Sequence, residues 1–419
     1  MNRHPGLFSL ALLGTALTIP LTGSRLLGQA APPAAAPPLT APPAAGPAGN
    51  IDAIRGSSAV AGAAPAITTF INGHVTALTT GNPAAAAAAR DKLIDTAGAG
   101  ASPAFLAAYA GLLDTAIAPA LQNPSEIVRL NAGIVVARVA ERSDNGGLSP
   151  ATLILLNDKS RNVVLWGVKS ARWIIPALLR AGPPAGANPM LTAVVKAVGA
   201  HGQGAIGGPI VVEAYEALTV DALSSNPKRR PTPAMVTAVI PFMHQLLQQR
   251  VAAYQKGLPP EPGADSRGTL FLVDATVWNL HTPPQRVTSV QAMSDLVGLG
   301  AQHAAMAAPG DLADLGYMIG LVSKAIAVVP QNAAIQAQLG PAMKIDARAN
   351  AAQIQAAVGA IPAALKTVKD FAALTPPPAV AARAPAPAQS PAGNGGGTNP
   401  PTTAPATTTG PAKTASTSP

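Results

Sequence analysis

The sequence predicts an all-α fold, either a solenoid of helical repeats or an irregular multi-helix array. Apolar residues recur at helical spacing along most of residues 51–375. No stretch shows the alternation of apolar and polar residues that is typical of a half-buried strand. Segments 121–130 and 156–165 also echo each other at an offset of 35 residues, which indicates an internal repeat.

Each copy of the repeat places a polar turn before a long apolar helix. In the first copy, Asn123 is the expected helix cap and Pro124 suits the first helical position. In the second copy, Asp158 is the expected cap. The expected buried stripes are Ile127, Leu130, Ile134 and Ala137 in the first helix, and Val164, Val168, Ala171, Ile175 and Leu178 in the second. A helix cannot bury such a stripe alone, so a neighbouring copy is expected to cover it.

This pattern of a turn with Asn or Asp, a Val-Arg or Val-Val step and an Ala-rich helix resembles the HEAT and armadillo-type repeats. The residues that carry the resemblance are Asn123, Val128, Arg129, Asn131 and Ala132, and more loosely Asp158, Val163 and Trp166, with Val164 in place of the expected Arg. The two copies cover about a sixth of the chain. The resemblance implies a solenoid of paired helices that binds macromolecules, and it implies no catalytic residues.

The ends of the chain differ from its middle in composition. Residues 1–30 are predicted to be a secretory signal peptide, with Arg3 before an apolar run and small residues for cleavage near Ala30. A retained membrane anchor is the alternative, but the apolar run is shorter than the roughly 20 residues that a span needs. Residues 31–50 are predicted to be a Pro/Ala-rich disordered linker, and 376–419 a disordered Pro/Ala/Thr/Gly-rich tail. The mature chain is therefore expected to be secreted or periplasmic, without a transmembrane span.

Between these arms the sequence predicts HEAT-like repeats over 51–258 and a C-terminal helical region over 259–375. The Pro-rich stretch 259–265 separates the two regions. Besides the two repeat helices, helices are expected at 65–79, 83–97, 103–121, 190–200, 209–223, 233–256, 267–281, 284–307, 311–329, 331–343 and 348–373.

The composition and motifs exclude several kinds of site. The chain has no cysteine, so it forms no disulfide and offers no thiolate nucleophile. Residues 202–207 match the glycine-rich dinucleotide fingerprint, but no clear strand precedes them, so they are expected to be a loop between helices. The six histidines form no HExxH pair, and no Gly-x-Ser-x-Gly motif is present. We therefore predict no catalytic residue, no cofactor and no metal site.

One helical face suggests a binding surface. Between 160 and 181, four basic residues fall within about a quarter-turn, and two tryptophans seven residues apart flank them. Arginine beside tryptophan can stack or make cation–π contacts with a partner. The alternative is that both tryptophans pack on an adjacent repeat while the basic groups are merely solvated. The candidate partner-binding residues are Arg161, Trp166, Lys169, Arg172, Trp173 and Arg180.

The function predicted from these observations is a non-enzymatic, secreted or periplasmic binding or scaffolding protein with a protein partner. The alternative is a structural envelope protein that associates electrostatically with anionic cell-wall or membrane polymers, because the chain carries a net charge of +9. An enzyme without a recognisable motif is third. No specific nucleic acid is expected as a partner, and the sequence leaves the oligomeric state open.

Overall fold

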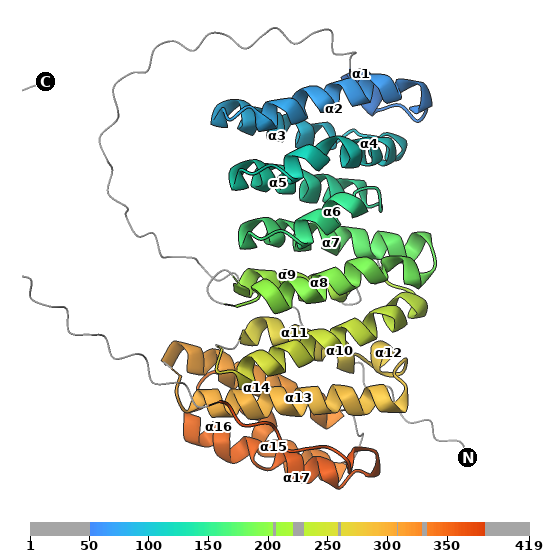
Figure 1. The fold of residues 1–419 in the computed structure, drawn as a ribbon. Helices are drawn as coiled ribbons and strands as arrows, with labels where there is room; N and C mark the ends of the chain where they lie inside the picture. Colours follow the sequence, from blue (N-terminus) through green and yellow to red (C-terminus); the bar gives the residue numbers. More distant parts are fainter. Residues whose placement is uncertain are drawn as a thin grey trace, which may run out of the picture. The chain divides into compact units, whose positions relative to one another are not determined.

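The computed structural model describes residues 51–203, 207–220, 230–258, 261–307, 309–328 and 333–381, which belong to one unit, Ala48–Pro419. It confirms the all-α prediction, because the described residues form helices and contain no strand (Figure 1). The predicted signal peptide and linker lie outside the described residues. So do residues 382–419 of the predicted tail.

The α-helices begin and end close to the predicted limits over most of the chain. They are α1 (Ile51–Arg55), α2 (Ala64–Thr79), α3 (Pro83–Thr96), α4 (Pro103–Leu121), α5 (Glu126–Ser143), α6 (Ser149–Leu156), α7 (Arg161–Ala181), α8 (Asn188–His201), α9 (Gly207–Leu218), α10 (Pro233–Gln255), α11 (Pro262–Val273), α12 (Ala275–Trp278), α13 (Pro283–Ala304), α14 (Pro309–Val328), α15 (Ala333–Met343), α16 (Ala351–Val358) and α17 (Ile361–Lys366). Short 3₁₀ turns lie at Ala61–Ala63, Pro184–Ala187 and Lys369–Phe371.

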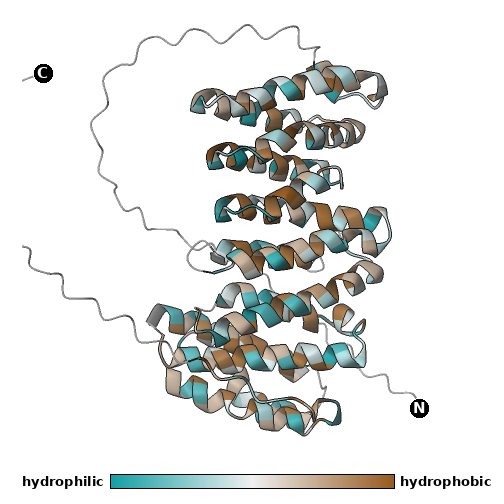
Figure 2. Ribbon diagram, viewed as in Figure 1, coloured by the Kyte–Doolittle hydropathy of each residue, from teal (hydrophilic) through white to brown (hydrophobic). Residues whose placement is uncertain are grey.

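Six successive pairs of helices stack in sequence order (Figure 1). The first helices of the pairs pack on one another in the order α2, α4, α6, α8, α10 and α13. The second helices do the same in the order α3, α5, α7, α9, α11 and α14. Each inner pair therefore packs on a pair at both sides, which is the arrangement that a helical-repeat fold requires. Every layer carries both apolar and polar segments (Figure 2).

Two predicted helices are broken into shorter ones. The helix predicted at 267–281 is interrupted at Asp274, whose carboxylate caps α12 by accepting from the backbone N–H of Thr276 at 2.9 Å. The helix predicted at 348–373 is divided into α16, α17 and a 3₁₀ turn. Pro362 lies at the start of α17 and has no N–H to continue the preceding helix. Helix α6 was not predicted, because its eight residues are mostly apolar and show no clear periodicity.

Two clusters of buried apolar side chains meet in α13. The larger cluster runs from Ile51 to Leu299, and the smaller one from Val290 to Leu374. Tyr109, Tyr215 and Tyr254 are among the largest side chains that are fully buried. The Tyr109 hydroxyl donates to the carbonyl of Leu93 at 2.9 Å, which satisfies the polar end of this buried ring.

The predicted buried stripe is confirmed in α7 but only in part in α5, where Ala137 is buried and Leu130 and Ile134 are half-buried. In α7, four of the five predicted residues are fully buried and Leu178 is half-buried. In α5, Ile127 is 69% exposed, and the buried side consists of Val128, Arg129, Ala132, Gly133, Val135, Val136, Ala137, Val139 and Ala140. The prediction assumed that the large side chains of Ile127 and Ile134 would be buried. The buried side is instead made of valine, alanine and glycine, which allow α5 and α7 to approach closely.

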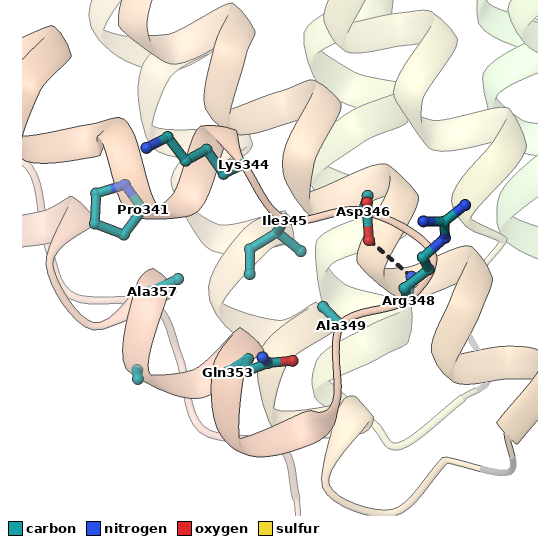
Figure 3. A pocket seen from close by; sticks show the side chains of 9 residues that line it. Pro341, Lys344, Ile345, Asp346, Arg348, Ala349, Gln353 and Ala357 are labelled. Atoms are coloured by element: carbon teal, nitrogen blue, oxygen red, sulfur yellow. Dashed lines mark hydrogen bonds between the residues drawn. The ribbon is translucent and has the colours of Figure 1, made fainter.

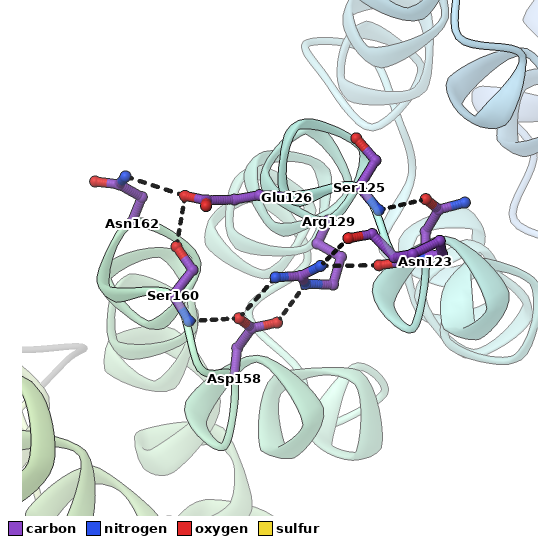
Figure 4. A network of polar contacts seen from close by, with 8 residues as sticks. Asn123, Ser125, Glu126, Arg129, Asp158, Ser160 and Asn162 are labelled. Atoms are coloured by element: carbon purple, nitrogen blue, oxygen red, sulfur yellow. Dashed lines mark hydrogen bonds and ion pairs between the residues drawn. The ribbon is translucent and has the colours of Figure 1, made fainter.

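The matched turns of the two repeat copies have the same geometry and touch each other (Figure 4). Asn123 accepts from the backbone N–H of Ser125 at 2.9 Å, and Asp158 accepts from that of Ser160 at 2.7 Å. Both helices therefore begin two residues later than predicted, with Ser125 and Ser160 at the cap positions in place of Asn123 and Asp158. The Asn123 carboxamide and the Asp158 carboxylate instead stabilise the turns that precede the helices.

A buried ion pair joins these two turns. The Arg129 guanidinium donates to Asp158 at 2.7 and 3.3 Å, and its third nitrogen donates to the carbonyl groups of Asn123 and Pro124 (Figure 4). Glu126, at the first position of α5, accepts from Ser160 at 2.7 Å. Consecutive repeats are thus held in register by polar contacts whose members are all satisfied.

Helix α4 is the one described helix with the length and hydropathy of a membrane span. It packs on α2, α5 and α6, and Phe105, Tyr109, Leu113 and Ile117 along it are fully buried. The apolar side chains of α4 therefore pack against the neighbouring helices of the array. The described residues contain no clear transmembrane span.

A second buried ion pair fixes the middle of the array. Asp265 of α11 is fully buried and accepts from the Arg250 guanidinium of α10 at 3.0 Å. The hydroxyl groups of Tyr215 and Tyr254 also donate to this carboxylate. Arg250 also donates to the carbonyl of Gly202 at 3.5 Å. The Asp265 carboxylate therefore connects α9, α10 and α11, and Arg250 extends the connection to the end of α8.

We expect Arg250→Met to lower the free energy of unfolding by about 3–5 kcal/mol, because the substitution leaves the Asp265 carboxylate buried without its cation. Urea denaturation followed by circular dichroism measures this change. Arg180→Met is the matched control, because Arg180 pairs with Asp144 where both side chains are 40% exposed. An exposed pair contributes about 0–1 kcal/mol. Equal losses for the two variants would contradict the assigned role of the buried pair.

Candidate functional site

Four of the six predicted binding residues lie together on α7, and the other two lie at its ends. Trp166, Lys169, Arg172 and Trp173 line one depression between α5, α7 and α9. Arg161 and Arg180 are about 28 Å apart along the helix axis, since each residue adds 1.5 Å. Arg180 pairs with Asp144 at 2.7 Å. The candidate site therefore consists of the middle of α7, and not of the whole predicted strip.

Both tryptophans have cations against their rings. Lys169 Nζ lies 5.0 Å from the Trp166 ring centroid, and Arg138 Cζ from α5 lies 5.9 Å from it. Arg172 Cζ lies 5.6 Å from the centroid of Trp173. Cations within about 6 Å of an indole are attracted to its ring. These contacts fix the orientation of both rings at the surface.

The two tryptophans differ in how they meet the core, although both are half-buried. Trp173 packs against the larger apolar cluster. Trp166 lies over Gly133 of α5, where an added Cβ would be 3.3 Å from the Trp166 Cβ. Each tryptophan is thus partly covered by the protein and partly exposed. Both residues are therefore partly packed on the protein, and contact with a partner stays a prediction for both.

Acidic residues from α9 compensate the predicted basic strip. Glu213 lies 3.6 Å from Lys169 and 3.7 Å from Arg172, measured between the charged atoms. Glu216 lies 3.4 Å from Arg172 and also pairs with Arg267 of α11. The side chains of Lys169 and Arg172 are each 36% exposed, so each pair alone contributes little to stability. Together the pairs make the face charge-balanced and connect α7, α9 and α11.

The depression between these residues is small. Its volume is about 100 Å³, and it is lined by Ala137, Arg138, Glu141, Trp166, Lys169, Arg172, Trp173 and Glu213. Pockets for small molecules usually measure about 300–1,000 Å³. The depression is therefore smaller than a site for a whole metabolite or cofactor usually is, and it has the size of a single side chain.

A larger hollow lies at the loop between α15 and α16 (Figure 3). It measures about 510 Å³, is widely open to solvent, and has Lys344 and Arg348 on its rim. The Asp346 carboxylate accepts a hydrogen bond from the backbone N–H of Arg348 at 2.8 Å. Glycines on α14 allow the loop to approach, since a Cβ at Gly320 would be 2.0 Å from the Ile345 carbonyl.

Two histidines that are distant in sequence meet inside the protein. His244 of α10 and His281 are each within hydrogen-bond distance of the Ser289 hydroxyl, at 2.7 and 3.2 Å. His281 Nδ1 lies 2.9 Å from the carbonyl of Val277, which can only accept, so this nitrogen carries the proton. In the neutral pair, Ser289 then donates to His281 and accepts from His244. Sequence analysis missed this pair, because 37 residues separate the histidines.

This cluster has the residue types of a nucleophile and its base, but not their placement. Ser289 is fully buried, and both histidines are less than 10% exposed. The Ser289 hydroxyl therefore reaches no substrate in this conformation. Burial, and then the neighbouring His281, lower the pKa of His244 to about 4. Burial also lowers the pKa of His281. Both histidines are therefore neutral at pH 7.

The other sequence motifs show no ligand-binding geometry in the described residues. The glycine-rich segment 202–207 follows helix α8, not a strand, and residues 204–206 lie outside the described residues. Within the described ranges, no three His, Asp or Glu side chains converge as metal ligands would. No protein-family model matches the chain, and no curated protein matches it either.

We expect acid to destabilise the fold through His244. Its folded pKa of about 4 lies below the ordinary value of 6.5, so the unfolded chain binds protons more readily. The associated stability is complete above pH 6.5 and is lost as the pH falls toward 4. The loss is about 3 kcal/mol, because each pKa unit corresponds to 1.36 kcal/mol. Urea denaturation between pH 7 and pH 4 should show this fall, and His244→Gln should reduce it. The same pH dependence in both proteins would contradict the prediction.

Proposed function

We propose that this chain is a non-enzymatic binding or scaffolding protein, and that it contacts a protein partner through the face around Trp166 and Trp173. We further propose that its array of helix pairs is of the HEAT-like type. The stacked pairs and the matched turns at Asn123 and Asp158 support this type. The predicted signal peptide supports a secreted or periplasmic location.

The observation that carries the proposal is the pair of half-buried tryptophans beside a depression of side-chain size. Tryptophan and arginine are the residues most often responsible for binding energy at protein interfaces. Here Arg138, Lys169 and Arg172 hold the rings in place before any partner arrives. A preorganised aromatic surface loses little side-chain entropy on binding.

The charge balance of the face favours a protein partner over an anionic polymer. Glu213 and Glu216 already form ion pairs with Lys169 and Arg172. A polymer of phosphates or carboxylates would need these cations. A protein surface with both charge signs can instead exchange pairs with this face. Rim charges of this kind set the orientation of a partner and the rate of association.

Electrostatic association with an envelope polymer is the second candidate, and the net charge of +9 favours it. Exposed cations away from α9, such as Arg161 at the start of α7, would supply that attraction. The two candidates differ in salt dependence. Contacts between exposed charges weaken strongly as the salt concentration rises, whereas burial of a tryptophan does not.

We expect Trp166→Ala to reduce partner capture by about 30-fold, which corresponds to the roughly 2 kcal/mol of an interface hot spot. Purified chain is used to capture proteins from an envelope fraction of the source cells, and the captured proteins are quantified by mass spectrometry. Because Trp166 is only half-buried, its loss should cost less stability than the about 3–5 kcal/mol of a core aromatic. Thermal unfolding is therefore measured for the same variant.

Tyr317→Ala is the matched control, because Tyr317 is a 55% exposed aromatic residue on α14. It should leave both capture and thermal unfolding unchanged. A large loss of stability in Trp166→Ala would place this ring in the core and remove the nominated site. Capture that is insensitive to Trp166 but is abolished by salt, with binding to vesicles of an anionic phospholipid, would support the second candidate instead.

A further inference from the structure

An extended proline-rich segment lies along α13 and is held there by two glutamines. This strap consists of residues 375–381. Gln291 donates to the carbonyl of Thr375 at 3.1 Å and accepts from the N–H of the same residue at 2.9 Å. Gln302 donates to the carbonyl of Pro378 at 3.0 Å and accepts from the N–H of Val380 at 2.7 Å. Both side-chain amides thus bind the strap backbone with their donor and acceptor atoms.

Two further contacts complete the seat of the strap. The Ala381 N–H donates to the carbonyl of Gln255, the last residue of α10, at 2.7 Å. Pro377 lies against Gly298 of α13, where an added Cβ would be 2.4 Å from two ring carbons of the proline. Glycine is a poor helix former, so its place in the middle of α13 is explained by this close approach. We call the surface formed by Gln291, Gly298, Gln302 and the Gln255 carbonyl the α13 seat.

The α13 seat recognises backbone geometry more than side chains. It binds backbone N–H groups at Thr375, Val380 and Ala381, and Pro376, Pro377 and Pro378 between them offer none. Proline favours an extended conformation, so little entropy is lost when such a segment is bound. A matching ligand is therefore an extended segment with N–H groups at these positions and a proline opposite Gly298.

The chain contains a second segment that meets these requirements. Residues 39–45 read Leu-Thr-Ala-Pro-Pro-Ala-Ala, and residues 374–380 read Leu-Thr-Pro-Pro-Pro-Ala-Val. Thr40, Ala45 and Gly46 align with the three strap residues whose N–H groups are bound, and none of them is proline. Pro42 aligns with Pro377, the residue that touches Gly298. The alignment thus preserves each backbone donor and the one close packing contact.

We propose that the α13 seat binds residues 39–46 of a second copy of this chain, in competition with the strap. The strap has the advantage of being attached, which gives it a high effective concentration at the seat. It also carries Val380, which packs against the larger core cluster, where the second segment has the smaller Ala45. Binding between copies therefore increases when the strap is released, and the strap acts as a built-in competitor of self-association.

The test uses the full chain and a synthetic peptide of residues 37–49 with a fluorescent label. Thr375→Pro/Val380→Pro removes two strap N–H donors without changing the seat. Fluorescence anisotropy should show the peptide binding this variant at least about tenfold more tightly than the unaltered chain, which is a difference of about 1.4 kcal/mol. Adding Gln291→Ala/Gln302→Ala should abolish the binding. A peptide with Thr40→Pro/Ala45→Pro should not bind.

Two results would overturn the proposal. One is peptide binding that does not change when both glutamines are replaced, which would place the peptide elsewhere. The other is binding by a peptide of residues 373–383 with none by residues 37–49, which would show that the seat accepts only the strap sequence. A second measurement requires no variant. A large excess of peptide 37–49 should speed hydrogen exchange at Thr375, Val380 and Ala381 of the unaltered chain, and unchanged exchange would contradict displacement.

Discussion

Each helix pair depends on the next pair to cover its apolar side, and this dependence organises the described chain. Alanine-rich helices bury little area one at a time, so stability has to be gathered over many close contacts. Close contact in turn brings polar turns together. The buried ion pairs Arg129–Asp158 and Arg250–Asp265 then determine how successive helices align. If the helices joined by either pair shifted relative to each other, a charge would be buried without its partner, and this would destabilise the fold.

The sequence predicted the helices well and their contacts less well. Periodicity identified the buried side of α7 because valine and isoleucine form it. In α5 the buried side consists of smaller residues and includes Arg129, whose partner Asp158 lies in the next repeat. No local pattern reveals such a pairing. The proposed binding face shows the same limit, because the glutamates that balance Arg172 lie on α9, two helices further along the chain.

The tryptophan face and the α13 seat use different physical means of recognition. The face around Trp166 presents aromatic surface with cations against the rings, and we propose a protein partner with a protruding side chain for it. The α13 seat presents two amides at a set spacing, and it suits an extended backbone with few specific side chains. The first can be selective through shape. The second can accept any segment with the right order of prolines and N–H groups.

The strap also has a mechanical consequence. Because Ala381 is bonded to Gln255, the helices α11 to α17 lie within a closed stretch of chain. Arrays of stacked repeats commonly fray from their ends, since a terminal repeat has a neighbour on one side only. Here a pull on the C-terminus reaches the hydrogen bonds of the strap before it reaches α17. Helix α17 separates from the array only after the hydrogen bonds of the strap break. The C-terminal end of the array therefore resists unfolding more than its helix contacts alone would allow.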